Sequence, residues 1–303
     1  MKRVLSVSLG SKQRDHRCEV ELLGERVEIA RVGTDGDLDK AVAIVRELDG
    51  KVDAFGMGGI DRYLVAGGRR YEIRDSLRLV RAARQTPIVD GSGLKNTLER
   101  ETVHYLGAEL GVPLAGNRAL LVSAVDRFGM AEAFTEAGAR LICGDLIFAL
   151  GISIPLHSLR SLRCLAAILL PVLTRLPFTF LYPTGKRQDE TTPKHGRFFA
   201  GAEIIAGDYL FIKKNMPDSL AGKVIVTNTV TAADVEDLRR RKARLLVTTT
   251  PELAGRSFGT NVMEAAIVAL SGKRPEDMTA DDYRDWLRRL ALKPRSVWLG
   301  DGC

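Results

Sequence analysis

The chain has few cysteines, and their spacing organises no site. Cys18, Cys143, Cys164 and Cys303 are scattered through 303 residues, with no CxxC pair and no partner histidine spacing. Zinc sites and disulfide frameworks both depend on such recurring spacings, so the sequence predicts no metal and no disulfide scaffold. Cysteine usage of this kind is typical of a reducing compartment, so we expect a cytoplasmic location.

Long apolar runs are also missing. The start, MKRVLSVSLG, enters a β-like run directly and lacks the apolar stretch of about 7–15 residues and the cleavage site of a signal peptide. The most apolar segment, residues 156–176, carries three arginines, and its uncharged part, 165–174, is far shorter than the roughly 20 residues that span a bilayer. We therefore expect a core helix there and no membrane partner.

Neither sign of charge dominates strongly. Lys and Arg number 45 against 38 Asp and Glu, a net charge of +7. The bases are interleaved with acids and no stacking aromatics accompany them, so a nucleic-acid surface is not predicted. A mild basic excess does suit a small anionic substrate or a phosphate-bearing cofactor.

What the sequence does contain is a regular alternation of strand-like and helix-like segments, which predicts an α/β fold. A break rich in Gly and Pro, GVPLAGN, follows the first third and places a domain boundary near Pro113. We predict an N-terminal α/β substrate domain over residues 1–112 and a second domain over 113–303.

The second domain reads as continuous apolar strands separated by helices, which is typical of a parallel sheet covered on both faces. We expect a Rossmann-like domain with C-terminal helices. Its strands are predicted at 118–125, 140–148, 178–182, 202–207, 223–230 and 244–250.

The first of these strands carries the main sign of a nucleotide site. In a dinucleotide-binding unit the strand turns into a helix whose N-terminus holds the pyrophosphate, and an acid about 20 residues further on binds the ribose. Asp145 has that position. The turn, SAVDRFG, supplies Gly129 but lacks the earlier glycines of GxGxxG, so a pocket with another use stays open. The candidate pyrophosphate-binding residues are Ser123, Asp126, Arg127 and Gly129.

Later strands end in small polar residues. Because the carboxyl ends of parallel strands meet at one edge of a sheet, these residues would surround a ligand there. Turn or cap roles are the alternative. The candidates are Thr227, Asn228, Thr248 and Thr249, with Gly207 and Asp208.

The layout resembles the shikimate and quinate dehydrogenases, in which a substrate domain precedes a nicotinamide-binding Rossmann domain. ALLVSAVDRFGMAEAFTEAGA lies where that family has its glycine-rich turn and helix, and VTTTPELAG is similar to its strand ending in a Thr-Pro loop; together they cover about residues 118–253. The resemblance implies an NAD(P)-dependent oxidoreductase acting on a small hydroxylated carboxylic acid. It also implies NAD, with NADP as the alternative. A homodimer stays open.

The first domain lacks the family's catalytic Lys and Asp sequences. The nearest substitute is VDGSGLKNTLERE, in which Asp90 and Lys95 lie at a strand end and a helix start. A lysine beside a carboxylate can transfer a hydroxyl proton, so both are catalytic candidates, with Asn96 as a substrate ligand. A surface role for Lys95 is the alternative.

Two further segments offer groups for substrate binding. FGMGGIDRY places Asp61 and Arg62 after a glycine-rich strand end, where Arg62 could bind a substrate carboxylate with two parallel hydrogen bonds. A plain tight turn is the alternative.

GRSFGTN places Arg256 before an apolar helix, where it is expected to face a cleft between the domains together with Ser257, Thr260 and Asn261. Helix capping by Thr260 or Asn261 is the alternative. The basic loop 183–197 is a candidate lid or phosphate-binding segment.

Two rival functions come from other classes. One is a non-catalytic nucleotide-sensing or interaction protein with a degenerate Rossmann domain, which the missing glycines favour. The other is an S-adenosylmethionine-dependent transferase, which can also place an acid at the end of its second strand.

Overall fold

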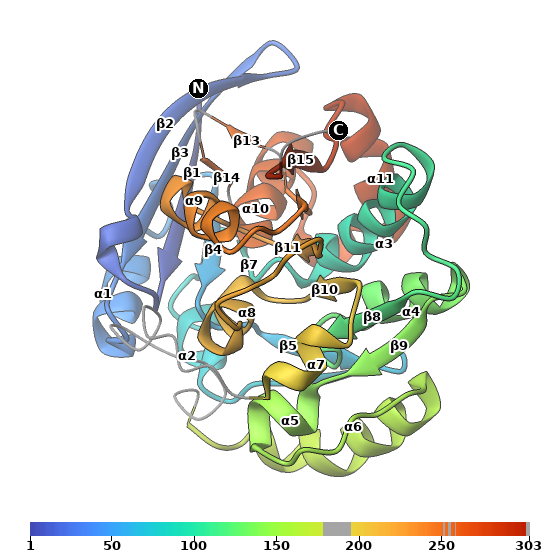
Figure 1. Cartoon of the computed structure of the whole chain (residues 1–303). Coiled ribbons are helices and arrows are strands. Elements are labelled where there is room, and N and C mark those ends of the chain that lie inside the picture. Colours follow the sequence, from blue (N-terminus) through green and yellow to red (C-terminus); the bar gives the residue numbers. More distant parts are fainter. Residues whose placement is uncertain (178–194, 251, 254–255, 258, 301–303) are drawn as a thin grey trace.

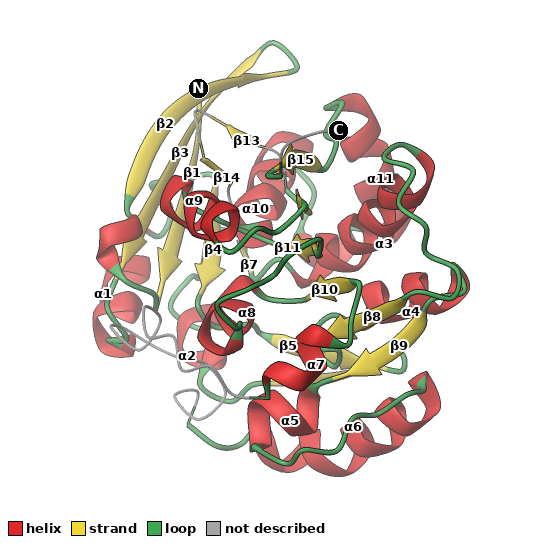
Figure 2. Cartoon of the chain, in the orientation of Figure 1, coloured by secondary structure: helices red, strands yellow, loops and turns green. Residues whose placement is uncertain are grey.

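The computed structural model describes residues 1–177, 195–250, 252–253, 256–257 and 259–300. The chain folds as two mostly parallel sheets covered by helices, so the expected α/β class is confirmed (Figure 2). The strand predicted at 178–182 and nearly all of the basic loop lie outside the described residues. No helix in the described ranges is long and apolar enough to cross a membrane.

The first sheet has the strand order β2-β3-β1-β4-β7. Its strands are β1 (Lys2–Ser8), β2 (His16–Leu22), β3 (Glu25–Gly33), β4 (Ala54–Gly58) and β7 (Ile88–Val89). Only β2 runs antiparallel, to β3. A short hairpin of β5 (Tyr63–Ala66) and β6 (Arg69–Glu72) follows β4.

Side chains alternate across β1 and bury both faces of this sheet. Leu5 and Val7 pack with helices α1 (Leu38–Leu48) and α2 (Ser76–Val80), whereas Val4 packs with α10 (Thr260–Ser271) and α11 (Ala280–Arg289). The last two helices lie late in the chain, within the segment assigned above to the second domain. α10 nevertheless packs on the first sheet, and α11 packs on α3 (Ser92–Ala108) (Figure 1).

The second sheet has the order β15-β12-β11-β10-β8-β9. Its strands are β8 (Arg118–Leu121), β9 (Arg140–Cys143), β10 (Ile204–Ala206), β11 (Val224–Thr227), β12 (Leu245–Thr248) and the antiparallel β15 (Arg295–Trp298). The central strands are buried along their whole length, as the apolar runs predicted. The order reverses between β8 and β10, which is where doubly wound sheets bind ligands.

Helices cover both faces of the second sheet. One face carries α7 (Gly196–Ala200), α8 (Tyr209–Asn215) and α9 (Ala232–Arg240), and the other carries α4 (Phe128–Glu136) and α6 (Leu159–Leu173). The short α5 (Asp145–Leu150) follows β9. The remaining elements are the 3-10 turns Lys12–Arg14 (η1) and Pro275–Asp277 (η4), and a small hairpin of β13 (Glu252–Leu253) and β14 (Arg256–Ser257).

The long helix α3 (Ser92–Ala108) joins the two halves. Its first turns bury Leu94 and Leu98 with the first sheet, and its later turns bury Val103 and Leu106 in the core that includes the second sheet. Gly91, at φ 94°, begins this helix, and a Cβ there would lie 2.7 Å from the backbone nitrogen of Asn261. Glycine is required because the start of α10 approaches so closely.

Candidate functional site

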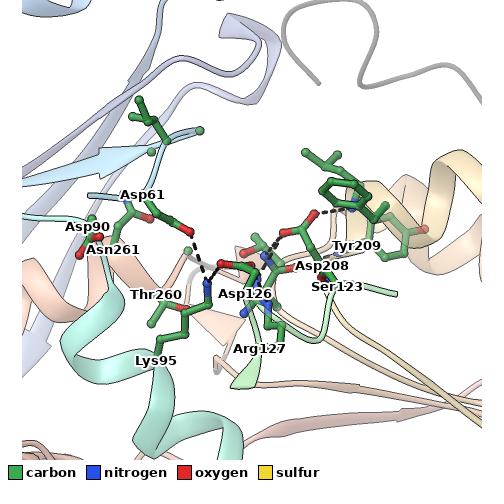
Figure 3. A pocket seen from close by; sticks show the side chains of 18 of the residues that line it. Asp61, Asp90, Lys95, Ser123, Asp126, Arg127, Asp208, Tyr209, Thr260 and Asn261 are labelled. Carbon is green, nitrogen blue, oxygen red and sulfur yellow. Dashed lines mark hydrogen bonds and ion pairs between the residues drawn. The ribbon is translucent and has the colours of Figure 1, made fainter. Parts of the chain in front are cut away.

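A cavity of about 330 Å³ lies where the carboxyl ends of the two sheets face each other. The first sheet contributes the residues that follow β4, including Asp61, and Asp90 after β7. The second sheet contributes the turn after β8, Asp208 after β10 and Asn228 after β11. Because both sheets are mostly parallel, polar side chains from distant parts of the chain converge there (Figure 3).

Lys95 occupies the centre of this convergence. It lies in the first turn of α3, and its Nζ is 2.5 Å from Oδ1 of Asp126 and 3.4 Å from Oδ2 of Asp61 (Figure 3). All three side chains line the cavity and are at most 23% exposed. The ammonium therefore joins a carboxyl group from each sheet.

Burial and mutual charge separate the titration of the two acids. Burial raises the pKa of Asp61 to about 8 against the opposing pull of Lys95, and the carboxylates of Asp126 and Asp90 add to the rise. Burial also opposes ionisation of Asp126, but Lys95 and Arg127 outweigh it and hold that pKa well below its usual range. Asp61 is therefore the acid of the pair that holds a proton more readily, and it shares a hydrogen bond with Asp126.

Arg127 fixes the position of the second-sheet residues. Its side chain is 5% exposed and places one terminal nitrogen 2.8 Å from Oε1 of Glu99 and the other 3.3 Å from Oδ2 of Asp208. Asn228 donates to the same Asp208 oxygen at 2.8 Å. Burial works against the guanidinium, but Glu99, Asp126 and Asp208 more than compensate and raise the pKa of Arg127.

The predicted proton-transfer pair of Lys95 and Asp90 is not formed. Both Asp90 oxygens accept hydrogen bonds from the local chain: one from the backbone N–H of Arg62 at 2.6 Å, the other from the N–H and hydroxyl of Ser92 at 3.0 and 2.7 Å. Asp90 thus fastens the start of α3 to the loop after β4. The acids that contact Lys95 are Asp61, expected as a substrate ligand, and Asp126, expected to bind a cofactor.

Asp145 has a different role from the one its spacing suggested. It borders the cavity, but its two oxygens accept hydrogen bonds from the backbone N–H groups of Val125 at 2.9 Å and Ala124 at 3.2 Å. Burial raises its pKa to about 6, although these hydrogen bonds oppose the rise. The N–H groups that a pyrophosphate would use at this turn are therefore occupied, and the residues do not fit the predicted pose. NAD binding itself stays a prediction, but this turn does not provide the pyrophosphate site that was expected.

Several other predicted ligands point elsewhere. The Thr227 hydroxyl donates to the Gly207 carbonyl and that of Thr248 to the Thr250 carbonyl, both at 2.8 Å in buried turns. Thr249 is also buried and does not border the cavity. Of the polar residues ending these strands, Asn228 and Asp208 reach it, and Ser123 does so from the neighbouring turn.

Two more candidates, Arg62 and Asn96, do not line the cavity. Arg62 directs Nε to Glu72 at 3.1 Å and stacks on the Tyr63 ring. Asn96 faces α4, where a Cβ on Gly129 would meet its Oδ1 at 1.9 Å, so Gly129 serves the contact between α3 and α4 rather than a phosphate. Arg256 lies in β14, and its side chain is outside the described part of the structure.

One end of the cavity is lined by basic residues that were not predicted from the sequence. Arg14, His16 and Arg31 line it near the end of β1, and Arg31 donates to the Ser8 hydroxyl at 2.9 Å. Asn261, expected at a cleft between the domains, lines this cavity and donates to the Ser6 hydroxyl at 2.9 Å. The available signal was the pair of serines inside the apolar run VLSVSL, since buried polar residues on a strand need partners.

An apolar wall completes the cavity. Leu165, Leu169 and Leu173 of α6 contribute to it, as do Leu146 and Leu150 of α5. No group of three or more His, Cys, Asp or Glu side chains in the described ranges is arranged to hold a metal ion. The site is therefore a two-sheet ligand cavity with an acidic cluster, a cationic end and an apolar wall.

Two family models together cover nearly the whole chain. The chain belongs to the family described as Domain of unknown function (DUF8754), whose model matches residues 93–299. Residues 3–90 match a second model, Domain of unknown function (DUF8753). The two matches meet at the start of α3, the helix that joins the sheets.

No curated protein matches the chain. Solved structures that resemble it include GanP, a glucose-galactose binding protein from Geobacillus stearothermophilus, at 10% identity over 99% of this chain and 98% of that one, with a TM-score of 0.44. Another is a periplasmic ribose ABC transporter protein from Conexibacter woesei, at 11% identity over 95% and 94%, with a TM-score of 0.38. A putative malic enzyme matches at 12% identity over 96% and 83%, with a TM-score of 0.35.

These comparisons correct the resemblance stated above. The matched family is DUF8754 and not the shikimate and quinate dehydrogenases, so that assignment is wrong. The NAD(P)-dependent oxidoreductase function is withdrawn with it, because the family that implied it is not the one the chain belongs to and because Asp145 occupies the N–H groups that a pyrophosphate would use. The cytoplasmic location is withdrawn as well. Catalysis and a homodimer remain predictions.

Proposed function

We propose that this protein binds a small hydroxyl-bearing anion in the cavity between its two sheets. The observation that carries the proposal is the Lys95 cluster, in which groups from both sheets converge on one ligand-sized space. A space of this size is of the order of small-molecule pockets, which occupy roughly 300–1,000 Å³.

The cluster suits hydroxyl groups because a hydroxyl both donates and accepts hydrogen bonds. The Lys95 ammonium can donate a hydrogen bond and the Asp126 carboxylate can accept one, whereas Asp61 already shares a hydrogen bond with Asp126. Asn228 and Ser123 also border the cavity on the second-sheet side. Such a mixed set favours a molecule with more than one hydroxyl over a purely apolar ligand.

The cationic end suits the negative group of the same ligand. Arg14 and Arg31 border the cavity there, and Arg31 also pairs with Asp15 at 2.8 Å. Arginine binds carboxylate or phosphate through charge-assisted hydrogen bonds. A ligand that bridges the two ends would carry its hydroxyls at one and its anion at the other.

Calorimetric titration with D-glucuronate, D-glucose and acetate tests the proposal, because the three probes carry both groups, hydroxyls only and an anion only. We expect glucuronate to bind most tightly and Lys95→Met to weaken it by roughly ten- to a hundredfold, the value of a charge-assisted hydrogen bond. Lys273→Met is the control, since Lys273 pairs with Asp282 on the surface. If none of the three binds at millimolar concentration, the proposal fails.

A second candidate is an acid–base enzyme that acts at the same cluster. It is favoured by the placement around one ammonium of Asp61, whose pKa burial raises, and Asp126, whose pKa Lys95 and Arg127 lower, since such a pair can give and take a proton on one substrate. Deuterium uptake from D₂O into a bound probe, followed by NMR, would detect this activity. Asp126→Asn should abolish the uptake, and uptake that persists in that variant would refute the assignment.

A further inference from the structure

Helix α6 carries partly buried leucines on the cavity in addition to the residues that it buries in the core. In α6, Leu162, Ala166 and Leu170 form the core stripe and are at most 4% exposed. Leu165 and Leu169 lie one position before Ala166 and Leu170, and they border the cavity only partly buried. Leu165 and Leu169 thus form a partly buried stripe on the ligand space beside Ala166 and Leu170, which border it as well.

The wall is continuous with the polar cluster. Leu173 extends the stripe by one more turn, so that leucines at 165, 169 and 173 recur every four residues over about 12 Å of helix. Val125, adjacent to Asp126 in the chain, borders the same cavity as the leucines. Every α6 residue that borders the cavity within the described structure is Leu or Ala.

We propose that this leucine stripe is a subsite for a hydrocarbon arm, and that the natural ligand is an amphiphile: a hydroxylated anionic head joined to an alkyl chain. The inference rests on the proposed function, which places the head at Lys95. A sugar or hydroxy acid without an arm would leave the leucines in contact with water. Each methylene buried against them instead contributes about a fourfold gain in affinity.

Calorimetry on a homologous series tests the arm separately from the head. The probes are methyl, butyl, hexyl and octyl glucuronides, which share one head. The dissociation constant should fall about fourfold for each methylene until the wall is covered. Leu169→Asn should flatten the series and change the affinity for methyl glucuronide less than twofold.

Ile168→Asn is the matched control, because Ile168 directly precedes Leu169 in the same helix, is 72% exposed and does not border the cavity. It should keep the full chain-length dependence. If Leu169→Asn does not fold, as judged by thermal unfolding, Leu165→Asn takes its place.

The outcomes separate the two proposals. Methyl glucuronide that binds with no gain along the series overturns the hydrocarbon arm and leaves the head site standing. A gain that Leu169→Asn and Leu165→Asn do not reduce also overturns it, because the chain then lies elsewhere. No binding by any member overturns both proposals.

Discussion

Arg127→Met should cost about 3–5 kcal/mol of unfolding free energy at pH 7, the range for removing one partner of a buried ion pair. Arg127 and Glu99 are 5% and 2% exposed and 2.8 Å apart, so neither charge is hydrated. Methionine fills the space of the side-chain stem but leaves the Glu99 carboxylate without its cation. Asp208 also loses its contact with the guanidinium.

Urea denaturation followed by circular dichroism measures this loss. The control is Arg239→Met, because Arg239 is 48% exposed and pairs with Glu236 one turn away, a contact of about 0.3–0.5 kcal/mol. Adding Glu99→Gln to Arg127→Met should recover a large part of the loss by removing the uncompensated charge. A cost below about 1 kcal/mol, or no recovery in the double variant, would show that water reaches the pair.

The pH dependence gives a second check on the same reasoning. Burial already raises the pKa of Glu99, while Arg127 opposes the rise. Removing Arg127 should raise that pKa further above its unfolded value, so the folded variant binds a proton that the unfolded chain releases. The deficit of Arg127→Met should therefore shrink as the pH falls from 7 toward 5. A deficit independent of pH would refute this cause.

Three other predictions concern stability and use the same denaturation assay. Burial raises the pKa of Asp61 to about 8, above its unfolded value near 4, so the wild type should lose stability as the pH rises through this interval. Asp61→Asn should remove that loss. The same dependence of the unfolding free energy on pH in variant and wild type would contradict this. Glu264→Gln should likewise lessen the loss between about pH 4 and 8, because burial raises the pKa of Glu264 to about 8, and an unchanged profile would refute this. Gly91→Ala should cost about 1–3 kcal/mol more than Gly68→Ala, since both have positive φ but only the first Cβ would strike the backbone of Asn261, 2.7 Å away; equal costs would disprove the close approach.

The second sheet could be predicted from sequence because each central strand is a short apolar run bounded by polar or Gly-rich turns. The helix starts at Thr231 and Thr279 also have a local sequence signature, because each threonine forms a capping box with the aspartate three residues later. These signals are local. The packing of α10 against the first sheet could not be predicted from the sequence, because an apolar helix of this kind could cover either sheet.

The nucleotide site was mispredicted for a physical reason. A strand, a turn, a helix and an acid about 20 residues later occur in doubly wound folds generally. In such a fold the acid can accept hydrogen bonds from the protein's own backbone instead of binding a ribose. Asp145 does so by accepting the N–H groups of Ala124 and Val125. The missing glycines in SAVDRFG were the better signal, since the turn is held by a side chain and not shaped around a phosphate.

Lys95 was found from its sequence position, but its partners depend on the course of α3. This helix packs against both sheets, and its first turn borders the cavity between them, where Lys95 reaches an acid from each side. Neighbouring Asn96 points to α4 instead, since one residue along a helix turns the side chain by about 100°. The chemistry of the site thus follows from which face of α3 meets the cavity, a tertiary property that neither residue type nor spacing reveals.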